Sequence, residues 1–428
     1  MSTLPADEVR ATPVPHSPPW PYTYLMYVRR LLQLALLSGA AASAQTPPPS
    51  TSLRVSSRVD HVDVAGREPM VVEHPDGSLF VASYGNPPRP TLWKSSDHGA
   101  TWKRVDVGTE AQDAVGNSDV SLAVASDGTL YFVNLLFDRK KMEGAQVSIG
   151  VSRDAGATWE WSVLTRDRFA DRPWVGVSGG GVAHVIWSDG TGVHHAVSRD
   201  RGATWSERAR VFHTGGSSHL AVGPRGELAA YISPAYAGGF KFAPGIDHLA
   251  ISADGGESWR NRPAPGDRQW GEQASAFPRW VEPLAWDATG ALYSFWTNPA
   301  GLWLARSSDY GATWTTWKLA AANELVYFPF LTARGRGELA VSWFSGQDAT
   351  LRFHVARIDA AAPGIPRLLQ AQPVQLDSWS RTDPPHLDPA GEYAGVTFLR
   401  DGGIGAATPI FNSKNNRFGF TWWRFESR

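Results

Sequence analysis

The sequence predicts an all-β chain folded as a seven-bladed β-propeller, with an N-terminal strand closing the last blade; a six-bladed propeller is the alternative. Three observations lead to this fold. A Ser-x-Asp-x-Gly-x-Thr/Ser-Trp octamer occurs five times, a strand–glycine–strand pattern occurs seven times, and Gly, Pro and Trp number 42, 31 and 20. Repeats with a period of about 50 residues and four short strands each are the sequence signature of propeller blades.

The octamers indicate one recurring turn per blade. They start at residues 95, 152, 198, 252 and 307, so consecutive starts are 57, 46, 54 and 55 residues apart. In the first copy, 95–102, we expect Asp97 to accept hydrogen bonds within the turn and Gly99 to supply a positive φ. Trp102 is expected to pack between blades, since a large aromatic side chain buries much apolar area.

The strand–glycine–strand pattern marks the two inner strands of each blade. The seven copies begin at Val71, Leu122, Val175, Leu220, Leu284, Phe330 and Val396. After the sixth blade the chain offers three strands only, at Tyr393–Leu399, Ile404–Phe411 and Phe418–Phe425. We expect the strand at Leu53–Val64 to complete this last blade, because such closure removes an exposed sheet edge.

Composition excludes several classes of function. The 428 residues include 40 Lys and Arg against 41 Asp and Glu, a net charge of −1, which argues against an electrostatic nucleic-acid binder. The absence of cysteine excludes disulfides, thiolate metal sites, iron–sulfur clusters and cysteine nucleophiles. No zinc-protease, phosphate-loop or EF-hand motif occurs. We therefore expect no cofactor and no metal, and a monomer.

The N-terminal region has the pattern of an export signal. A basic run at 26–30 precedes an apolar stretch at 31–37 and the small residues Ala42-Ser43-Ala44. The apolar stretch is shorter than the roughly 20 residues needed to span a bilayer. We expect residues 1–25 to be an upstream extension, 26–44 a signal peptide cleaved after Ala44, 45–52 a linker and 53–428 the propeller. The mature protein would be secreted or periplasmic, without a membrane span; an uncleaved N-terminal anchor is the alternative.

The first residues of the innermost strands are expected to ring the axial mouth. They mix arginines, carboxylates and tyrosines: Arg67, Glu68, Asp119, Asp171, Arg172, His219, Arg279, Glu282, Tyr327, Glu392 and Tyr393. Such a ring suits an acidic sugar, because guanidinium groups bind a carboxylate bidentately and carboxyl groups serve as acid or base. The alternative is that any exposed ring of loops is polar.

The octamer resembles the Asp-box of the sialidase superfamily, in which these boxes lie on outer turns away from the active site. Three further segments are similar to sialidase site motifs, in the family's chain order. Residues 66–69, Gly-Arg-Glu-Pro, resemble the segment whose arginine belongs to the carboxylate-binding triad. Residues 281–284, Val-Glu-Pro-Leu, resemble the segment whose glutamate activates the nucleophile. Residues 392–405 resemble the segment that carries the nucleophilic tyrosine.

This resemblance implies a role for each matching residue. Tyr393 would be the nucleophile, Glu282 its activating base and Arg67 a carboxylate ligand. The family's acid/base aspartate has no counterpart in 85–90, so the acid would have to be Asp119 or Asp138, neither of which aligns with it; Asp119 is offered by position. Arg172 and Arg279 are offered by position as the second and third arginines of the triad.

Two classes of function follow. The first is a secreted sialidase-like glycoside hydrolase that releases a terminal sialic acid or a related acidic sugar from a glycan or glycoconjugate; a lyase is a variant of it. The second is a non-catalytic propeller that binds a glycan or a protein through its axial mouth. Fold alone does not choose between them. The discriminating observation is whether Arg67, Glu282 and Tyr393 converge.

Overall fold

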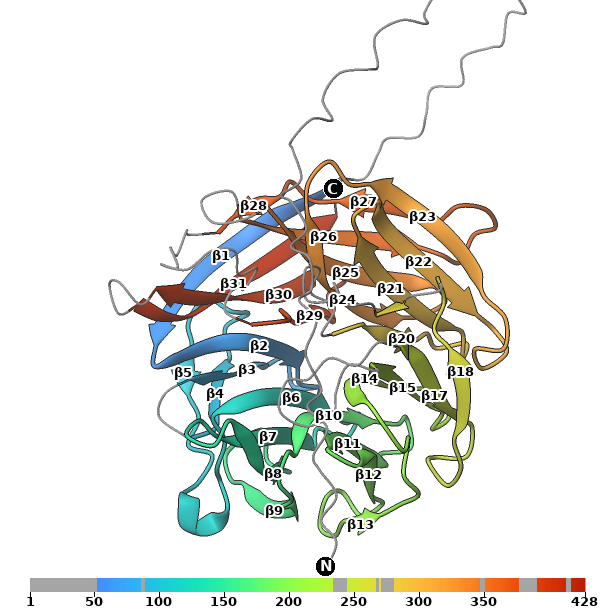
Figure 1. Cartoon of the computed structure of the whole chain (residues 1–428). Coiled ribbons are helices and arrows are strands. Elements are labelled where there is room, and N and C mark those ends of the chain that lie inside the picture. The colour runs from blue at the N-terminus through green and yellow to red at the C-terminus, as the bar shows by residue number, and fades with distance from the viewer. Residues whose placement is uncertain are drawn as a thin grey trace, which may run out of the picture. The chain divides into compact units, whose positions relative to one another are not determined.

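The computed structural model describes residues 52–85, 89–233, 245–266, 269–270, 281–346, 351–376, 391–412 and 417–427. The predicted upstream extension and signal peptide lie outside these residues, as does Arg279. The described residues form an all-β propeller in which seven antiparallel sheets, the blades, surround one axis, and a further two-stranded sheet is added (Figure 1). Within these residues a single 3₁₀ turn, η1 (Glu110–Gln112), interrupts the strands, and no helix among them is long and apolar enough to cross a membrane.

Each of the first six blades is a consecutive stretch of chain, with its first strand innermost. Blades one and two are β2 (Ala65–Glu73), β3 (Leu79–Gly85), β4 (Thr91–Ser95) and β5 (Lys103–Arg104), then β6 (Ser118–Val124), β7 (Leu130–Asp138), β8 (Glu143–Ser152) and β9 (Glu160–Thr165). Blades three and four are β10 (Asp171–Val177), β11 (Ala183–Asp189), β12 (Gly192–Ser198) and β13 (Ser206–Glu207), then β14 (Gly216–Val222), β15 (Leu228–Ser233), β17 (His248–Ser252) and β18 (Arg260–Pro263).

Blades five and six continue this order. They are β20 (Leu284–Trp286), β21 (Leu292–Asn298), β22 (Gly301–Ser307) and β23 (Thr315–Ala321), then β24 (Val326–Arg334), β25 (Glu338–Ser345), β26 (Arg352–Asp359) and β27 (Arg367–Gln370). Two additions were not predicted from the sequence: β28 (Val374–Gln375) also pairs with β26, and β16 (Gly245–Ile246) pairs with β19 (Gln269–Trp270).

Blade seven confirms the predicted closure. It combines β29 (Val396–Phe398), β30 (Ile404–Asn412) and β31 (Arg417–Ser427) with β1 (Leu53–Asp63), in the order β1-β31-β30-β29. The innermost strands β2, β6, β10, β14, β20, β24 and β29 contact one another in that order, and β29 contacts β2 (Figure 1). The ring therefore has seven blades, not six.

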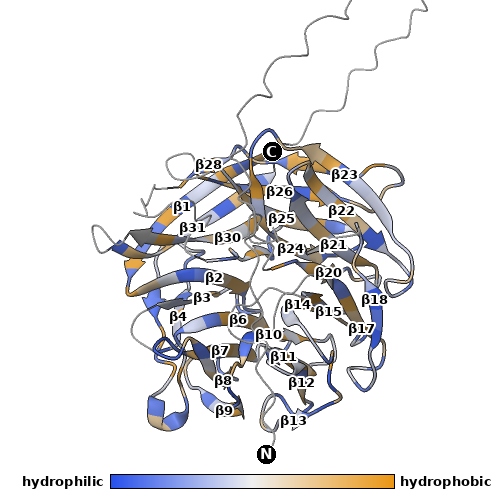
Figure 2. Ribbon diagram, in the orientation of Figure 1, coloured by the Kyte–Doolittle hydropathy of each residue, from blue (hydrophilic) through white to orange (hydrophobic). Residues whose placement is uncertain are grey.

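The strand β1 also fastens blade seven to blade one. Its residues alternate between less and more exposed side chains along its length, and Figure 2 shows both hydrophilic and hydrophobic residues on the strand. Asp60 accepts a hydrogen bond from the Thr421 hydroxyl at 2.9 Å, within blade seven. Asp63 accepts one at 2.7 Å from the indole N–H of Trp93, which lies fully buried in blade one.

The octamers form near-identical turns between the third and fourth strands of blades one to five. In blade one the Ser95 hydroxyl donates to the Asp97 carboxylate at 2.8 Å and accepts from the Gly99 N–H at 2.8 Å. The same carboxylate accepts from the N–H and the hydroxyl of Thr101 at 2.9 and 2.5 Å. These hydrogen bonds lower the pKa of Asp97 to about 2. The Gly99 φ of 91° and the burial of Trp102 are as predicted.

We predict that β1 is required for stability and that the residues before it are not. A chain that begins at residue 64 should melt lower than the full chain by roughly 10 °C or more and should aggregate, because β31 becomes an unpaired edge. A chain that begins at residue 52 is the matched control and should melt like the full chain. Equal melting temperatures for the two truncated chains would show that β1 does not close the ring.

Candidate functional site

The innermost strands of blades one, three and six begin with the same irregular backbone. Glu68, Arg172 and Phe328 each precede a proline, each has a φ of 49°, and each lies at a shift in the strand register. A non-glycine residue in this region is strained by about 1–3 kcal/mol, and bulges of this kind redirect side chains beside functional sites. In blades one and three the redirected residues are charged. They belong to a group that we call the axial cluster: Arg67, Glu68, Tyr84, Asp119, Asp171, Arg172, Glu392 and Tyr393.

Glu68 is the buried acid of the axial cluster. Its side chain is 4% exposed, and one carboxyl oxygen accepts a hydrogen bond from the Glu392 N–H at 3.0 Å. Gly391 allows this approach, since a Cβ there would lie 2.1 Å from Glu68 Cγ. The other carboxyl oxygen has no hydrogen-bond partner among the described residues. Burial, and then the charges of Asp119 and Glu392, raise the pKa of Glu68 well above its usual value. Both effects favour the neutral acid.

Tyr393 joins blade seven to blade two. Its hydroxyl donates to the Val120 carbonyl at 2.8 Å and accepts from the Val120 N–H at 3.2 Å. Its ring packs on that of Trp174, with 5.3 Å between centroids. Burial, and then the charges of Glu68 and Asp119, raise the pKa of Tyr393 well above its usual value. In this arrangement the phenol is neutral and held between two blades.

Asp171 and Arg172 form the more accessible part of the axial cluster. Arg172 pairs with Glu392 across the axis, and these side chains are 13% and 29% exposed. The backbone carbonyl of Arg172 accepts a hydrogen bond at 2.7 Å from the hydroxyl of Ser217 in blade four. Burial, and then the charge of Asp119, raise the pKa of Asp171 to about 7, although Arg172 opposes the shift. The cluster therefore holds one carboxyl group that is half protonated near neutral pH.

Arg67 is the second guanidinium of the axial cluster. It lies over the ring of Tyr84, 5.9 Å from its centroid, which places it beside Glu68 in blade one. Burial, and then the charge of Glu68, raise the pKa of the Tyr84 hydroxyl. Within the described residues, no group of three or more His, Asp or Glu side chains is arranged to hold a metal ion.

The structure brings together four of the six residues selected from the sequence: Arg67, Asp119, Arg172 and Tyr393. It does not hydrogen-bond Glu282 to the Tyr393 hydroxyl, because both hydrogen bonds of that hydroxyl are with Val120. Glu282 is buried at the junction of blades four and five, where its N–H donates to the Ser218 hydroxyl at 2.9 Å.

Glu68 and Asp171 are the carboxyl groups of the axial cluster whose pKa values are raised, and neither has a role in the sialidase resemblance, although both are expected at the mouth. The signal that could have selected their segments is the proline that follows a charged residue at the start of an innermost strand. This signal occurs as Glu68-Pro69 and Arg172-Pro173, and also as Glu282-Pro283 directly before β20.

We predict that Tyr393→Phe lowers the free energy of unfolding by about 1–3 kcal/mol, because it leaves the buried Val120 peptide groups without partners. Urea denaturation measures this. Tyr131→Phe is the matched control: Tyr131 is also buried, but its hydroxyl has no partner among the described residues, so its loss should cost almost nothing. Equal effects of the two substitutions would contradict the assignment.

Comparison with known proteins identifies the fold. The sequence matches no family model and no curated protein. Among solved structures, it is similar to an ulvan lyase of a polysaccharide lyase family, with a TM-score of 0.51 and 10% identity over 86% of this chain and 95% of that one. A protein of unknown function from Dyadobacter fermentans gives a TM-score of 0.50 and 15% identity, over 89% of this chain and all of that one.

Sialidases are also among the similar structures. The intramolecular trans-sialidase of Ruminococcus gnavus aligns with a TM-score of 0.44 and 11% identity, over 86% of this chain and 94% of that one. At these identities the likeness concerns the fold. The chain is a seven-bladed β-propeller.

Proposed function

We propose that the protein is a glycoside hydrolase that acts, at the axial cluster, on a glycan carrying a carboxylated sugar such as a sialic or uronic acid. The observation that carries this proposal is the pair formed by Asp171 and Asp119. The charge of Asp119 helps to raise the pKa of Asp171 to about 7, and the two arginines of the cluster lie beside them.

Two carboxyl groups in unlike protonation states are what glycoside hydrolysis requires. Asp171, when protonated, would donate its proton to the glycosidic oxygen as the bond to the anomeric carbon breaks. Asp119 would be the second carboxyl group, either taking a proton from the attacking water or stabilising the positive charge on the sugar. Asp171 would be left as a carboxylate beside Arg172, whose backbone N–H donates to it at 3.0 Å.

The arginines supply recognition of the acidic sugar. A guanidinium group has five N–H donors, so Arg172 can keep its ion pair with Glu392 and still donate to a ligand carboxylate. Arg67 enters from the neighbouring blade one, held over Tyr84. A neutral sugar would lack the carboxylate that pairs with these two charges.

The family resemblance suggests a second mechanism, in which Tyr393 attacks the anomeric carbon with the help of Glu282. In that case the Tyr393 hydroxyl would have to leave Val120 before it could react. Activity of the Tyr393→Phe variant separates the two mechanisms, because Asp171-based catalysis does not use the phenolic oxygen.

We predict that kcat/KM on the best substrate falls as the pH rises through about 7, because the general acid must be protonated. Asp171→Asn should lower kcat by about 10²–10⁴-fold. The assay is a panel of fluorogenic sialosides and uronides, read from pH 4 to pH 9. The exposed Asp167→Asn is the matched control and should keep full activity.

The same variant has an expected effect on stability. Folding raises the pKa of Asp171. Between about pH 4 and pH 7 the unfolded chain is therefore deprotonated at Asp171 while the native state still binds the proton, so the native state loses stability as the pH rises through this range. Asp171→Asn should therefore raise the melting temperature more at pH 8 than at pH 4. If the wild-type protein cleaves none of the fluorogenic substrates, the proposed hydrolase activity is contradicted. The function would then be glycan binding at the axial mouth, and Arg67→Gln should weaken that binding.

We also propose that the protein is exported and cleaved after Ala44, on the basis of the basic, apolar and small-residue order of 26–44. N-terminal sequencing of the exported protein should read from Gln45. A sequence beginning at Met1 or Met26 would contradict the proposed cleavage.

A further inference from the structure

Each octamer turn packs against the blade before it. A Cβ on Gly156 of blade two would lie 2.9 Å from Phe80 of blade one, and a Cβ on Gly202 of blade three would lie 2.6 Å from Val151 of blade two. A Cβ on Gly311 of blade five would lie 3.7 Å from Ile251 of blade four. Val151 and Ile251 both come directly before an octamer. In blades two and four the residue at this position is thus covered by the octamer of the next blade.

Blade five lacks this cover because blade six has no octamer. In blade six, β26 and β27 are joined instead by the short turn 360–366. A cavity of about 260 Å³ lies between the two blades at this level. We call it the blade 5–6 cavity, and its lining includes Arg306, Ser308, Thr315, Trp317 and Gly364.

Arg306 stands in the blade 5–6 cavity where other blades have an apolar residue or a bonded lysine. The position directly before the octamer holds Val151, Val197 and Ile251 in blades two to four. In blade one it holds Lys94, whose ammonium donates to the Ala155 carbonyl of blade two at 2.9 Å. Within the described residues, the Arg306 guanidinium has no hydrogen-bond or ion-pair partner, and its buried Nε is unsatisfied. A buried donor without a partner is costly, so the group is suited to an anionic ligand.

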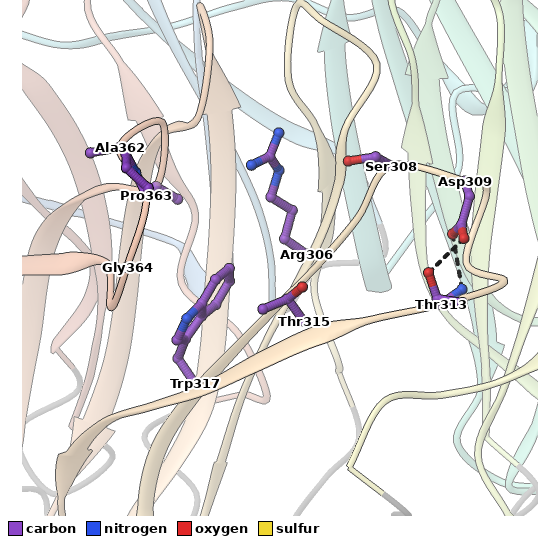
Figure 3. A pocket seen from close by; sticks show the side chains of 10 residues that line it. Arg306, Ser308, Asp309, Thr313, Thr315, Trp317, Ala362, Pro363 and Gly364 are labelled. Carbon is purple, nitrogen blue, oxygen red and sulfur yellow. Dashed lines mark hydrogen bonds between the residues drawn. The ribbon is translucent and has the colours of Figure 1, made fainter.

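The other walls of the cavity fit a sugar ring. Arg306 and Thr315 are register partners on β22 and β23, and Trp317 follows on the same face of the strand. Figure 3 shows the Arg306 guanidinium extending between the Ala362–Pro363 turn and Ser308, with the Trp317 ring on the side of Thr315. The indole gives an apolar face, and two hydroxyl groups lie nearby.

Asp309 places a negative charge in the lining of the blade 5–6 cavity. Its carboxylate accepts hydrogen bonds from Thr313 and Ser307, which lower its pKa to about 2, so it stays ionised. A ligand must therefore present a negative charge to Arg306 and hydroxyl donors toward Asp309. A carboxylated monosaccharide has both on one ring.

We propose that the blade 5–6 cavity is an accessory binding site for one carboxylated sugar unit, such as a hexuronate, separate from the axial cluster. The cavity is smaller than the roughly 300–1,000 Å³ of sites for drug-sized ligands, which favours a single sugar unit. Such a site would hold an acidic glycan at the outer part of the propeller. It rests on the cavity, the unpartnered guanidinium and the indole, and not on the proposed hydrolase activity.

Calorimetric titration of the full chain with D-galacturonate tests the site, with D-galactose as the neutral probe. Arg306→Gln should weaken galacturonate binding about tenfold or more, because a charge-assisted hydrogen bond is lost. Ala362→Asp places a negative charge on the exposed blade-six wall of the cavity. It should also weaken galacturonate binding, by repelling the sugar carboxylate, while Arg306 is unchanged. Arg260→Gln, on the exposed strand β18, is the matched control and should bind like the wild type. Galactose should bind at least tenfold more weakly than galacturonate.

Repeating the titration with an Arg67→Gln chain distinguishes binding at the blade 5–6 cavity from binding at the axial cluster. Galacturonate binding that survives Arg67→Gln and is lost on adding Arg306→Gln supports the accessory site, whatever the catalytic result. No galacturonate binding, binding abolished by Arg67→Gln alone, or binding unchanged in both Arg306→Gln and Ala362→Asp would overturn it. An acidic peptide that binds through Arg306 when galacturonate does not would also overturn it, in favour of a protein ligand.

Discussion

The pairing of β1 with β31 is the constraint on which the rest of the structure depends. It closes a ring of seven blades by giving the C-terminal blade a strand from the N-terminal side of the propeller. The axial cluster spans this closure. Glu68 of blade one accepts a hydrogen bond from Glu392 of blade seven, and the Tyr393 hydroxyl reaches Val120 of blade two. Opening the ring would separate the groups whose proximity gives the cluster its electrostatic character.

That character comes from placing several carboxyl groups and two arginines in one partly buried space. Burial disfavours every charge, and the carboxyl groups repel one another, so some of them keep their protons. Glu68 is the most deeply buried and is favoured as the neutral acid, while Asp171 is shifted only to about 7. The strained backbone at Glu68 and Arg172 is what turns these side chains toward the cluster. Strain retained at a charged position of this kind is typical of a functional site.

Much of the fold could be predicted from the sequence, because its signals are local. An octamer turn is held by hydrogen bonds among its own residues, so Ser95, Asp97 and Thr101 carry the information for it. The place of β1 follows from the missing strand of the last blade. The axial cluster was predictable in part, because the start of an innermost strand must lie near the axis, and Arg67, Asp119, Arg172 and Tyr393 all do so.

The partners within the cluster were not predictable, because they depend on which blades meet. The sialidase resemblance pairs Tyr393 with Glu282, but the carboxyl group that most affects the pKa of Tyr393 is that of Glu68 in blade one. The raised pKa of Asp171 likewise depends on burial and on Asp119 of another blade, neither of which is a local property. The blade 5–6 cavity depends on the absence of an octamer from blade six, a sequence feature whose consequence appears only when the blades are packed.

The central claim is that the axial cluster holds a carboxyl group ready to donate a proton near neutral pH. Titration of the aspartate side-chain carboxyl carbons by ¹³C NMR, with Asp171 assigned from its substituted variant, measures this without any substrate. We expect the Asp171 signal to titrate with a midpoint near 7, displaced from its usual value of 3.8. A midpoint close to 3.8 would contradict the account, since the cluster would then contain no acid suited to the proposed reaction.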